Sequence, residues 1–244
     1  MEPLPDHPVP TGPLAVRWHA WSLPELQAGT LAHARVELEN AGLARWRDGV
    51  NVAYHWLDER GNPIVWDGLR TPVALAPGER AEVDLRLRAP IPPGRYLLAF
   101  DLVDEHRFWF AELGNHVPER EVEVRPRDAS AARAFVPEGV EPAADWLERV
   151  RTAHEEGFAA VGGSVTVERG FLRRTPPELE AYAPGGGRNP AFTFPLVCPS
   201  LLPPLEPNAQ VAGLPAWRPG DGEPWLYDAR IAVRLRSRSG RRRG

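Results

Sequence analysis

The sequence has no lysine, one cysteine and no long apolar run. A single cysteine, Cys198, excludes an intramolecular disulfide and a zinc site made of several cysteines. The 29 basic residues, all arginine, stand against 33 acidic ones, for a formal net charge of -4. This balance gives no reason to expect a nucleic-acid partner or an acidic membrane surface. No apolar segment approaches the length of about 20 residues that a bilayer requires, so we expect no membrane insertion.

The first six residues, Met1 to Asp6, have neither the charged nor the apolar segment of a signal peptide. We therefore expect a cytoplasmic protein. A hydrophobic content of 43% and a charged content of 25% are normal for a globular chain. The 28 prolines and 22 glycines predict much turn, sheet edge and extended coil.

The stretch from Val36 to Trp56 shows the organisation of the first half. Residues 34–39 alternate apolar and charged, which predicts a strand with one buried face. Turn-forming residues follow at 40–42, and alternation resumes over 50–56. Trp46 lies between the two strands. We expect its indole to close the open end of a β-sandwich and its N–H to reach a turn carbonyl.

Similar short segments recur up to residue 125. They cover residues 14–18, 34–38, 50–56, 64–66, 73–75, 81–87, 96–102, 108–110 and 122–124. Roughly seven to nine short strands, with turn signals every 8–12 residues, are typical of an antiparallel sandwich. The segment 96–102 is apolar on both faces, which predicts a strand in the middle of a sheet. Without a disulfide, this core depends on packing alone.

Several motifs of this half occur together. They are Asn40-x-Gly42-x-x-x-Trp46, the run from Val50 through Tyr54-His55-Trp56-Leu57-Asp58, Gly61, Arg70-Thr71-Pro72, Pro77-Gly78, Pro93-Gly94-x-Tyr96, Asp101-Leu102-Val103 and Trp109-Phe110. With them, residues 12–125 resemble a bacterial immunoglobulin-like module of the kind joined to glycosyltransferases, methyltransferases and polysaccharide-export proteins. More distantly, they are similar to the four-tryptophan immunoglobulin-like domain of autophagy cargo receptors. The resemblance implies an accessory role, and no catalytic residue comes with it.

The second half predicts a small, irregular α+β segment. We expect a linker over 126–140, a Pro/Gly-rich segment over 141–236 and a basic tail over 237–244. A helix is expected over about 142–156, because Pro142 suits a first helical turn and Gly157 suits a helix end. Four apolar residues share one face of this helix, namely Trp146, Leu147, Val150 and Ala153.

Two strands are expected near this helix, over 158–167 and 225–235. Between them, the prolines and glycines of residues 170–225 leave little room for regular structure. The aromatic residues spread through that stretch argue against simple disorder. We expect an ordered, extended segment laid over another domain or another subunit.

Aromatic residues are the first candidates for a binding site, because exposed flat rings stack on the C–H faces of sugars. The candidate ligand-binding residues are Trp21, His55, Trp66 and Trp109, with Trp18 as a further ring. Trp21 is expected to be exposed because it has the opposite parity to Trp18, and Trp66 because it ends a strand. The alternative for each ring is packing in the core or under a loop.

A glycine loop over 184–190 supplies two further candidates, Arg188 and Asn189. Backbone N–H groups beside an arginine can hold a phosphate. However, the loop fits neither the P-loop nor the dinucleotide-binding pattern, and a plain turn is the alternative. Cys198 is a nucleophile only with a nearby base, and otherwise a small apolar filler.

Two acidic clusters complete the candidates. His106 and His116, beside Asp104 and Glu105, could form a metal site, with an exposed loop as the alternative that we favour. Asp221 and Glu223 could form a carboxylate pair, although no acid–base geometry can be deduced from one turn. We expect no metal and no cofactor.

The sequence therefore predicts a mainly β protein whose immunoglobulin-like sandwich precedes a small α+β segment. We favour a non-catalytic accessory module of a bacterial cell-surface polysaccharide system, which binds glycan or a partner enzyme. The alternative is a small transferase, related to glycosyltransferases, or a hydrolase with its site between the two halves. The Asp-x-Asp motif common in glycosyltransferases is missing from the sequence. A purely structural interaction protein is the third class.

Overall fold

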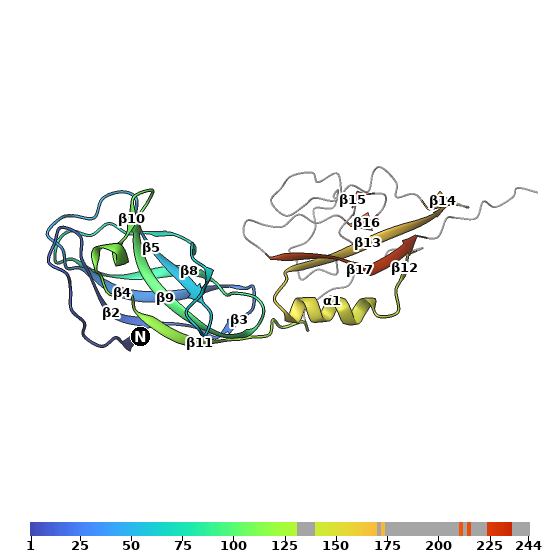
Figure 1. Ribbon diagram of the computed structural model, residues 1–244, viewed down its shortest axis with the longest axis horizontal. Coiled ribbons are helices and arrows are strands. Elements are labelled where there is room, and N and C mark those ends of the chain that lie inside the picture. The colour runs from blue at the N-terminus through green and yellow to red at the C-terminus, as the bar shows by residue number, and fades with distance from the viewer. Residues whose placement is uncertain (131–139, 170–171, 174–209, 212–213, 216–223, 236–244) are drawn as a thin grey trace, which may run out of the picture. The chain divides into compact units, whose positions relative to one another are not determined.

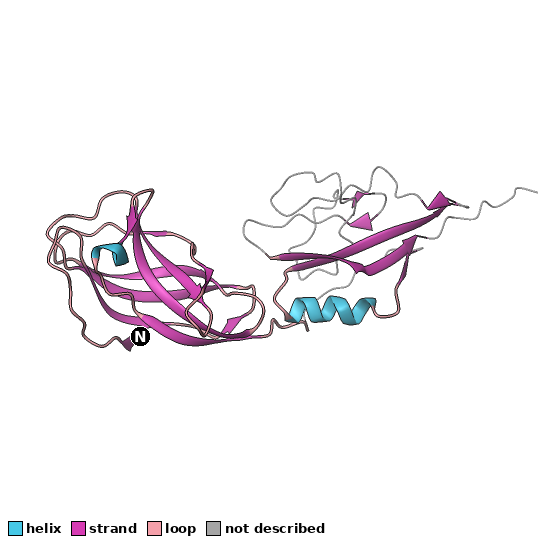
Figure 2. Ribbon diagram, in the orientation of Figure 1, coloured by secondary structure: helices cyan, strands magenta, loops and turns pink. Residues whose placement is uncertain are grey.

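Figure 1 shows the computed structural model, which describes residues 1–130, 140–169, 172–173, 210–211, 214–215 and 224–235. The chain divides into two compact units, Met1–Pro126 and Arg127–Gly244, and each is described by itself. Strands dominate the described residues, as Figure 2 shows, so the prediction of a mainly β protein is confirmed. No helix in these ranges combines the length and apolar character needed to cross a membrane.

The first unit is a sandwich of two sheets. In chain order its strands are β1 (Glu2–Pro3), β2 (Val16–Ser22), β3 (Leu26–Gln27), β4 (Leu31–Asn40), β5 (Val50–Leu57), β6 (Pro63–Val65), β7 (Thr71–Pro72), β8 (Arg80–Arg88), β9 (Gly94–Asp104), β10 (Phe108–Trp109) and β11 (Glu119–Arg125), with the 3-10 helix η1 (Phe110–Leu113) after β10. One sheet has the order β1-β2-β4-β8. The other has the order β3-β11-β9-β5-β6, with β10 paired to β9 and β7 paired to β5.

The strand order is that of an immunoglobulin fold. Strands β2, β4 and β8 lie in one sheet and β5, β9 and β11 in the other, which matches the A-B-E and G-F-C division. Near the start of β9, the hydroxyl of Tyr96 donates to the carbonyl of Pro92 at 2.5 Å. This is the tyrosine corner found at the same place in such folds. Burial raises the pKa of Tyr96.

The core lies between the two sheets, where alternate residues of each strand meet. On β5, the inward side chains Val52, Tyr54 and Trp56 are at most 2% exposed. Strand β9 lies between β5 and β11, as its apolar faces predict. Burial of each large apolar side chain contributes about 1.5–3 kcal/mol, which lets this core hold without a disulfide.

Trp21 departs from the sequence prediction. It is 3% exposed, and its ring lies 5.5 Å from that of Phe100 at an angle of 70°. The expected exposure is wrong because the register between β2 and β4 shifts between Trp18 and Ala20. An extra residue at such a bulge reverses the alternation of side chains, so Trp18 and Trp21 both face the core.

Trp46 lies in the connection that crosses from β4 to β5, and it is fully buried. Its ring meets that of Phe110 edge-on, with 5.8 Å between centroids. The prediction that its indole N–H reaches a turn carbonyl is wrong, because this N–H has no acceptor among the described residues. Instead, the backbone N–H of Trp46 donates to the carbonyl of Leu75 at 2.9 Å.

The second unit combines one helix with a sheet. Its elements are β12 (Val140–Pro142), α1 (Trp146–Glu155), β13 (Ala160–Arg169), β14 (Leu172–Arg173), β15 (Gln210–Val211), β16 (Leu214–Pro215) and β17 (Trp225–Leu235). The main sheet has the order β12-β17-β13-β14, and β13 runs parallel to β17. Helix α1 packs against β13 and β17 (Figure 1).

Helix α1 begins later than the sequence predicts. Pro142 pairs with Val233 in β12 rather than opening the helix, so the first helical residue is Trp146. At the other end, Gly157 has a φ of 113° and its N–H donates to the carbonyl of His154. The next N–H, of Phe158, reaches Ala153, which completes a Schellman ending.

The buried face of α1 also differs from the predicted one at Leu147. Leu147 is 54% exposed, whereas His154 is fully buried. The expected linker over 126–140 is described only in part, and the N–H of Arg127 bonds to the carbonyl of Glu155 at 3.1 Å. Most of the expected extended segment over 170–225 lies outside the described residues.

The rings of His7 and His116 lie against each other on the first unit, with centroids 4.3 Å apart and planes tilted by 35°. Burial lowers the pKa of His116, and so does a charge on His7, while Glu119 acts in the opposite direction. Between this lowered pKa and the ordinary value of about 6.5, the unfolded chain binds more protons than the folded one. We therefore expect the free energy of unfolding to fall modestly as pH drops from neutral through this window.

The test is the denaturant midpoint measured from pH 7.5 down to pH 5. His116→Gln is expected to flatten the pH dependence in this range, because the titrating ring is gone. An unchanged slope in that variant would assign the dependence to other groups.

Candidate functional site

The outer face of the second sheet holds a group of three aromatic rings, here called the outer cluster: His55, Trp66 and Trp109. Because Tyr54 and Trp56 face the core, His55 between them points to the opposite side of β5. The rings of His55 and Trp66 stack at 4.1 Å and 21°. Trp109 meets His55 at 4.5 Å and 61°, and meets Trp66 at 6.2 Å and 72°.

His55 fixes the position of Trp66. It is 3% exposed, and its Nδ1–H donates to the carbonyl oxygen of Trp66, which can only accept. Its Nε2 lies 4.0 Å from Oδ2 of the buried Asp101. The carboxylate of Asp101 in turn accepts the N–H groups of Leu102 and Ala111. His55 is therefore held from both sides.

Trp66 offers exposed aromatic surface. His55 stacks on the indole, yet the residue is 49% exposed. Part of Trp66 therefore remains accessible to a ligand. The indole N–H groups of Trp66 and Trp109 donate to no acceptor within the described ranges, so both are available to a ligand.

Arg70 joins the loop after Trp66 to the β9–β10 hairpin. Its guanidinium donates to Asp67 and Glu105, each at 2.8 Å, and to the carbonyl of Gly68 at 2.7 Å. It also lies 4.8 Å from the ring centroid of Trp109. Because these bonds connect two separate loops, Arg70 holds the two sides of the site at a fixed distance.

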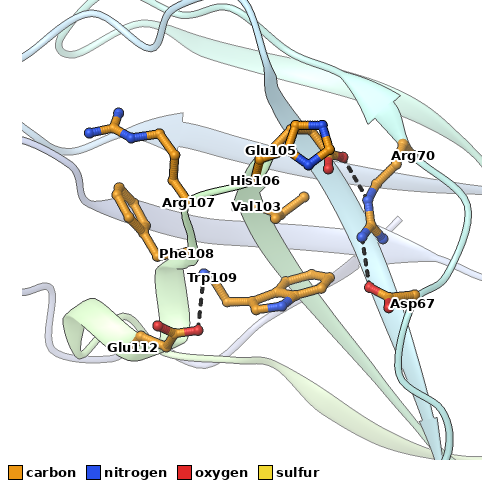
Figure 3. A pocket seen from close by; sticks show the side chains of 9 residues that line it. All are labelled: Asp67, Arg70, Val103, Glu105, His106, Arg107, Phe108, Trp109 and Glu112. Carbon is orange, nitrogen blue, oxygen red and sulfur yellow. Dashed lines mark hydrogen bonds and ion pairs between the residues drawn. The ribbon is translucent and has the colours of Figure 1, made fainter.

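A pocket of about 430 Å³ opens beside the outer cluster (Figure 3). It is lined by Asp67, Arg70, Val103, Glu105, His106, Arg107, Phe108, Trp109 and Glu112. Arg70 is neutralised by two carboxylates, and Arg107 bonds to Asp104 at 2.8 Å. Glu112 forms no ion pair with any described residue. The lining therefore offers hydrogen-bond donors and acceptors with little net charge.

The structure thus brings together three of the predicted site residues, His55, Trp66 and Trp109. Trp21 lies in the core. Trp18 is also buried, and its indole N–H donates to the carbonyl of His116 at 3.0 Å. The remaining candidates, Arg188, Asn189, Cys198, Asp221 and Glu223, lie outside the described residues.

Three of the four residues weighed as a metal site have other partners. Asp104 accepts from Arg47 and Arg107, Glu105 accepts from Arg70, and the ring of His116 lies against that of His7. In the part of the chain that the structure describes, no three side chains of His, Cys, Asp or Glu come together as a cation site.

Sequence reasoning missed Arg70, Phe108 and Glu112 as lining residues, and it considered His106 only as a metal ligand. Arg70 belongs to a motif noted for the fold and Phe108 to a predicted strand, but no spacing indicates that they share a pocket. Their proximity arises because β5 pairs with both β7 and β9, which brings the two loops to the same end of the sheet.

Neither a comparison with protein-family models nor one with curated proteins found a match. Among solved structures, the chain is similar to the C-terminal domain of Wzt, with 12% identity and a TM-score of 0.34 over 47% of this chain and 74% of that one. A β-glucosidase from Listeria innocua in complex with isofagomine gives 19% identity and a TM-score of 0.30, over 45% of this chain and 16% of the enzyme. A β-glucuronidase from glycoside hydrolase family 2 gives 12% and 0.29, over 62% of this chain and 14% of the enzyme. These likenesses are partial and low in identity, and they place the chain in no family.

Proposed function

We propose that the first unit is a non-catalytic module that binds glycan at the outer cluster. The observation that supports this most directly is the half-exposed indole of Trp66, stacked on a buried His55. A flat apolar face held rigid in this way suits the C–H face of a sugar ring and loses little side-chain entropy on binding.

The polar groups around Trp66 suit the hydroxyl groups of such a ligand. Asp67 and Arg70 follow it in the same loop, and they supply an acceptor and a donor next to each other. Because the charges are already paired, a neutral, hydroxyl-rich ligand fits better than a strongly charged one. An apolar surface with a few placed polar groups is the usual form of a small-molecule site.

The biological setting is a further part of the proposal. The motifs of residues 12–125 resemble immunoglobulin-like modules joined to polysaccharide enzymes and export proteins. We therefore assign the module to a bacterial cell-surface polysaccharide system, as an accessory part that brings a glycan to its machinery.

A partner protein is the second candidate. Ile64 and Val65 of the edge strand β6 are 44% and 36% exposed, and they precede Trp66 in the chain. Exposed apolar residues on an edge strand favour contact with another chain. The test is a double variant, Ile64→Ser with Val65→Ser. If this variant no longer captures a polysaccharide enzyme but still binds glycan, both functions share this side of the module.

The decisive experiment is a glycan array with the intact chain and its Trp66→Ala variant. We expect the variant to lose at least about tenfold in affinity, because removal of a stacking ring costs about 1.4 kcal/mol or more. Leu43→Ala is the matched control, since Leu43 is an apolar side chain that is 79% exposed and lies outside the outer cluster. Equal binding by wild type and Trp66→Ala would refute the proposed site.

A further inference from the structure

His106 has an unusual backbone conformation. Its φ is 61°, and it lies in the turn closed by the bond from the N–H of Arg107 to the carbonyl of Asp104 at 3.0 Å. Every other residue with positive φ in the described chain is a glycine. Histidine tolerates this left-handed region better than most residues, but glycine and asparagine fit it at lower cost.

The side chain of His106 has no partner within the described fold. The imidazole of His106 is exposed, and it makes no hydrogen bond, ion pair or ring contact with another described residue. It does line the pocket beside Trp109, and in Figure 3 the two rings lie on opposite sides of Val103. Strained residues without internal partners are characteristic of sites that bind something else.

We infer that this pocket is a second sugar subsite, in which His106 contacts the unit next to the one stacked on Trp66. The inference rests on the proposed function. The two subsites are adjacent, because Trp109 lines the pocket and lies 6.2 Å from Trp66 between ring centroids. A volume of about 430 Å³ falls within the usual range of ligand pockets.

The chemistry of the pocket names the ligand class. The imidazole of His106 can donate or accept a hydrogen bond, and the carboxylate of Glu112 can accept one. Phe108 and Trp109 supply apolar surface. Such a lining binds a hydroxyl-bearing ring rather than an apolar group. The ligand is therefore an oligosaccharide of at least two units. Because the planes of Trp66 and Trp109 differ by 72°, adjacent units bind in a bent arrangement rather than as a flat ribbon.

The test is calorimetric titration of the intact chain with glucose, mannose, maltotriose, cellotriose, laminaritriose and mannotriose. We expect at least one trisaccharide to bind more tightly than its monosaccharide. His106→Asn, which keeps a residue suited to the turn, is expected to lower affinity for that trisaccharide about fivefold, the effect of one hydrogen bond. Its affinity for the monosaccharide stays unchanged, whereas Trp66→Ala weakens both.

Two controls separate binding from folding. The thermal midpoint of His106→Asn is expected to equal or exceed that of the wild type, because asparagine adopts positive φ readily. His33→Asn changes another exposed histidine, on β4, and is expected to leave binding intact. If His106→Asn binds the trisaccharide as wild type does while Trp66→Ala does not, the second subsite is refuted and the proposed function stands. If no sugar of the panel binds the wild type, both are refuted.

Discussion

Replacing Asn40 with alanine is expected to lower the free energy of unfolding by about 3–5 kcal/mol. Asn40 is fully buried at the end of β4. Its side-chain amide donates to the carbonyls of Ala44 and Leu75, each at 2.9 Å, and its oxygen accepts the N–H of Gly42 at 3.0 Å. Alanine leaves the carbonyl of Ala44 and the N–H of Gly42 without this partner, while the carbonyl of Leu75 keeps the N–H of Trp46. Each buried group left unpaired costs about 1–3 kcal/mol.

Asn40→Asp is a second variant that tests the same three hydrogen bonds. Aspartate has nearly the same shape but presents only acceptors when ionised, so it faces two carbonyl oxygens and buries a charge. We expect it to destabilise the fold at least as much as alanine. Urea denaturation followed by tryptophan fluorescence measures both effects. A loss below about 1 kcal/mol for both variants would show that the amide does not hold this turn.

The same bonds give a physical reason for the Asn40-x-Gly42-x-x-x-Trp46 motif. The carbonyl of Leu75 accepts from both the amide of Asn40 and the backbone N–H of Trp46. A Cβ on Gly42 would lie 2.4 Å from the carbonyl oxygen of Pro13, so the close approach requires glycine. The motif therefore fixes how the chain crosses between sheets. It concerns the fold and not the ligand, which is why it indicated the sandwich well and the function poorly.

Local patterns indicated the long strands of the first unit but not which faces those strands bury. Alternation over 81–87 indicated β8, and the doubly apolar segment 96–102 indicated the central strand β9. The bulge in β2 was not visible, because it depends on pairing with β4, and it moved Trp21 into the core. Likewise, alternation over 50–56 did not indicate that both faces of β5 are covered, yet every residue of that strand is buried. Around His55, the rings of Trp66 and Trp109 cover the outer face.

The candidate site, too, could be predicted from the sequence only in part. Residue type alone suggested His55, Trp66 and Trp109 as ligand-binding rings, and the structure places them in one cluster. Arg70 and His106 could not be recognised in this way. The role of Arg70 depends on contacts with two loops, and that of His106 depends on a backbone conformation. Both properties arise only from tertiary structure.

Gly68→Ala is expected to abolish glycan binding as completely as the loss of Trp66 itself, with at least about a tenfold drop in affinity. A Cβ on Gly68 would lie 2.4 Å from the carbonyl oxygen of Tyr54 and 2.6 Å from its ring. Tyr54 cannot yield, because it is buried in β5 and its hydroxyl accepts the N–H of Arg88 at 2.9 Å. The loop must therefore move away, together with the indole that it presents.

Gly12→Ala is the matched control, since a Cβ there meets no atom within 4 Å. Calorimetric titration with a glycan that the wild type binds measures the effect, and thermal unfolding reports the accompanying loss of about 1–3 kcal/mol from overpacking. Full affinity in Gly68→Ala would mean that the loop tolerates displacement. The stacking face would then not depend on the close approach of Gly68 to Tyr54. In that case the stacking of Trp66 on His55, the neighbour of Tyr54 on β5, would be sufficient to hold the indole.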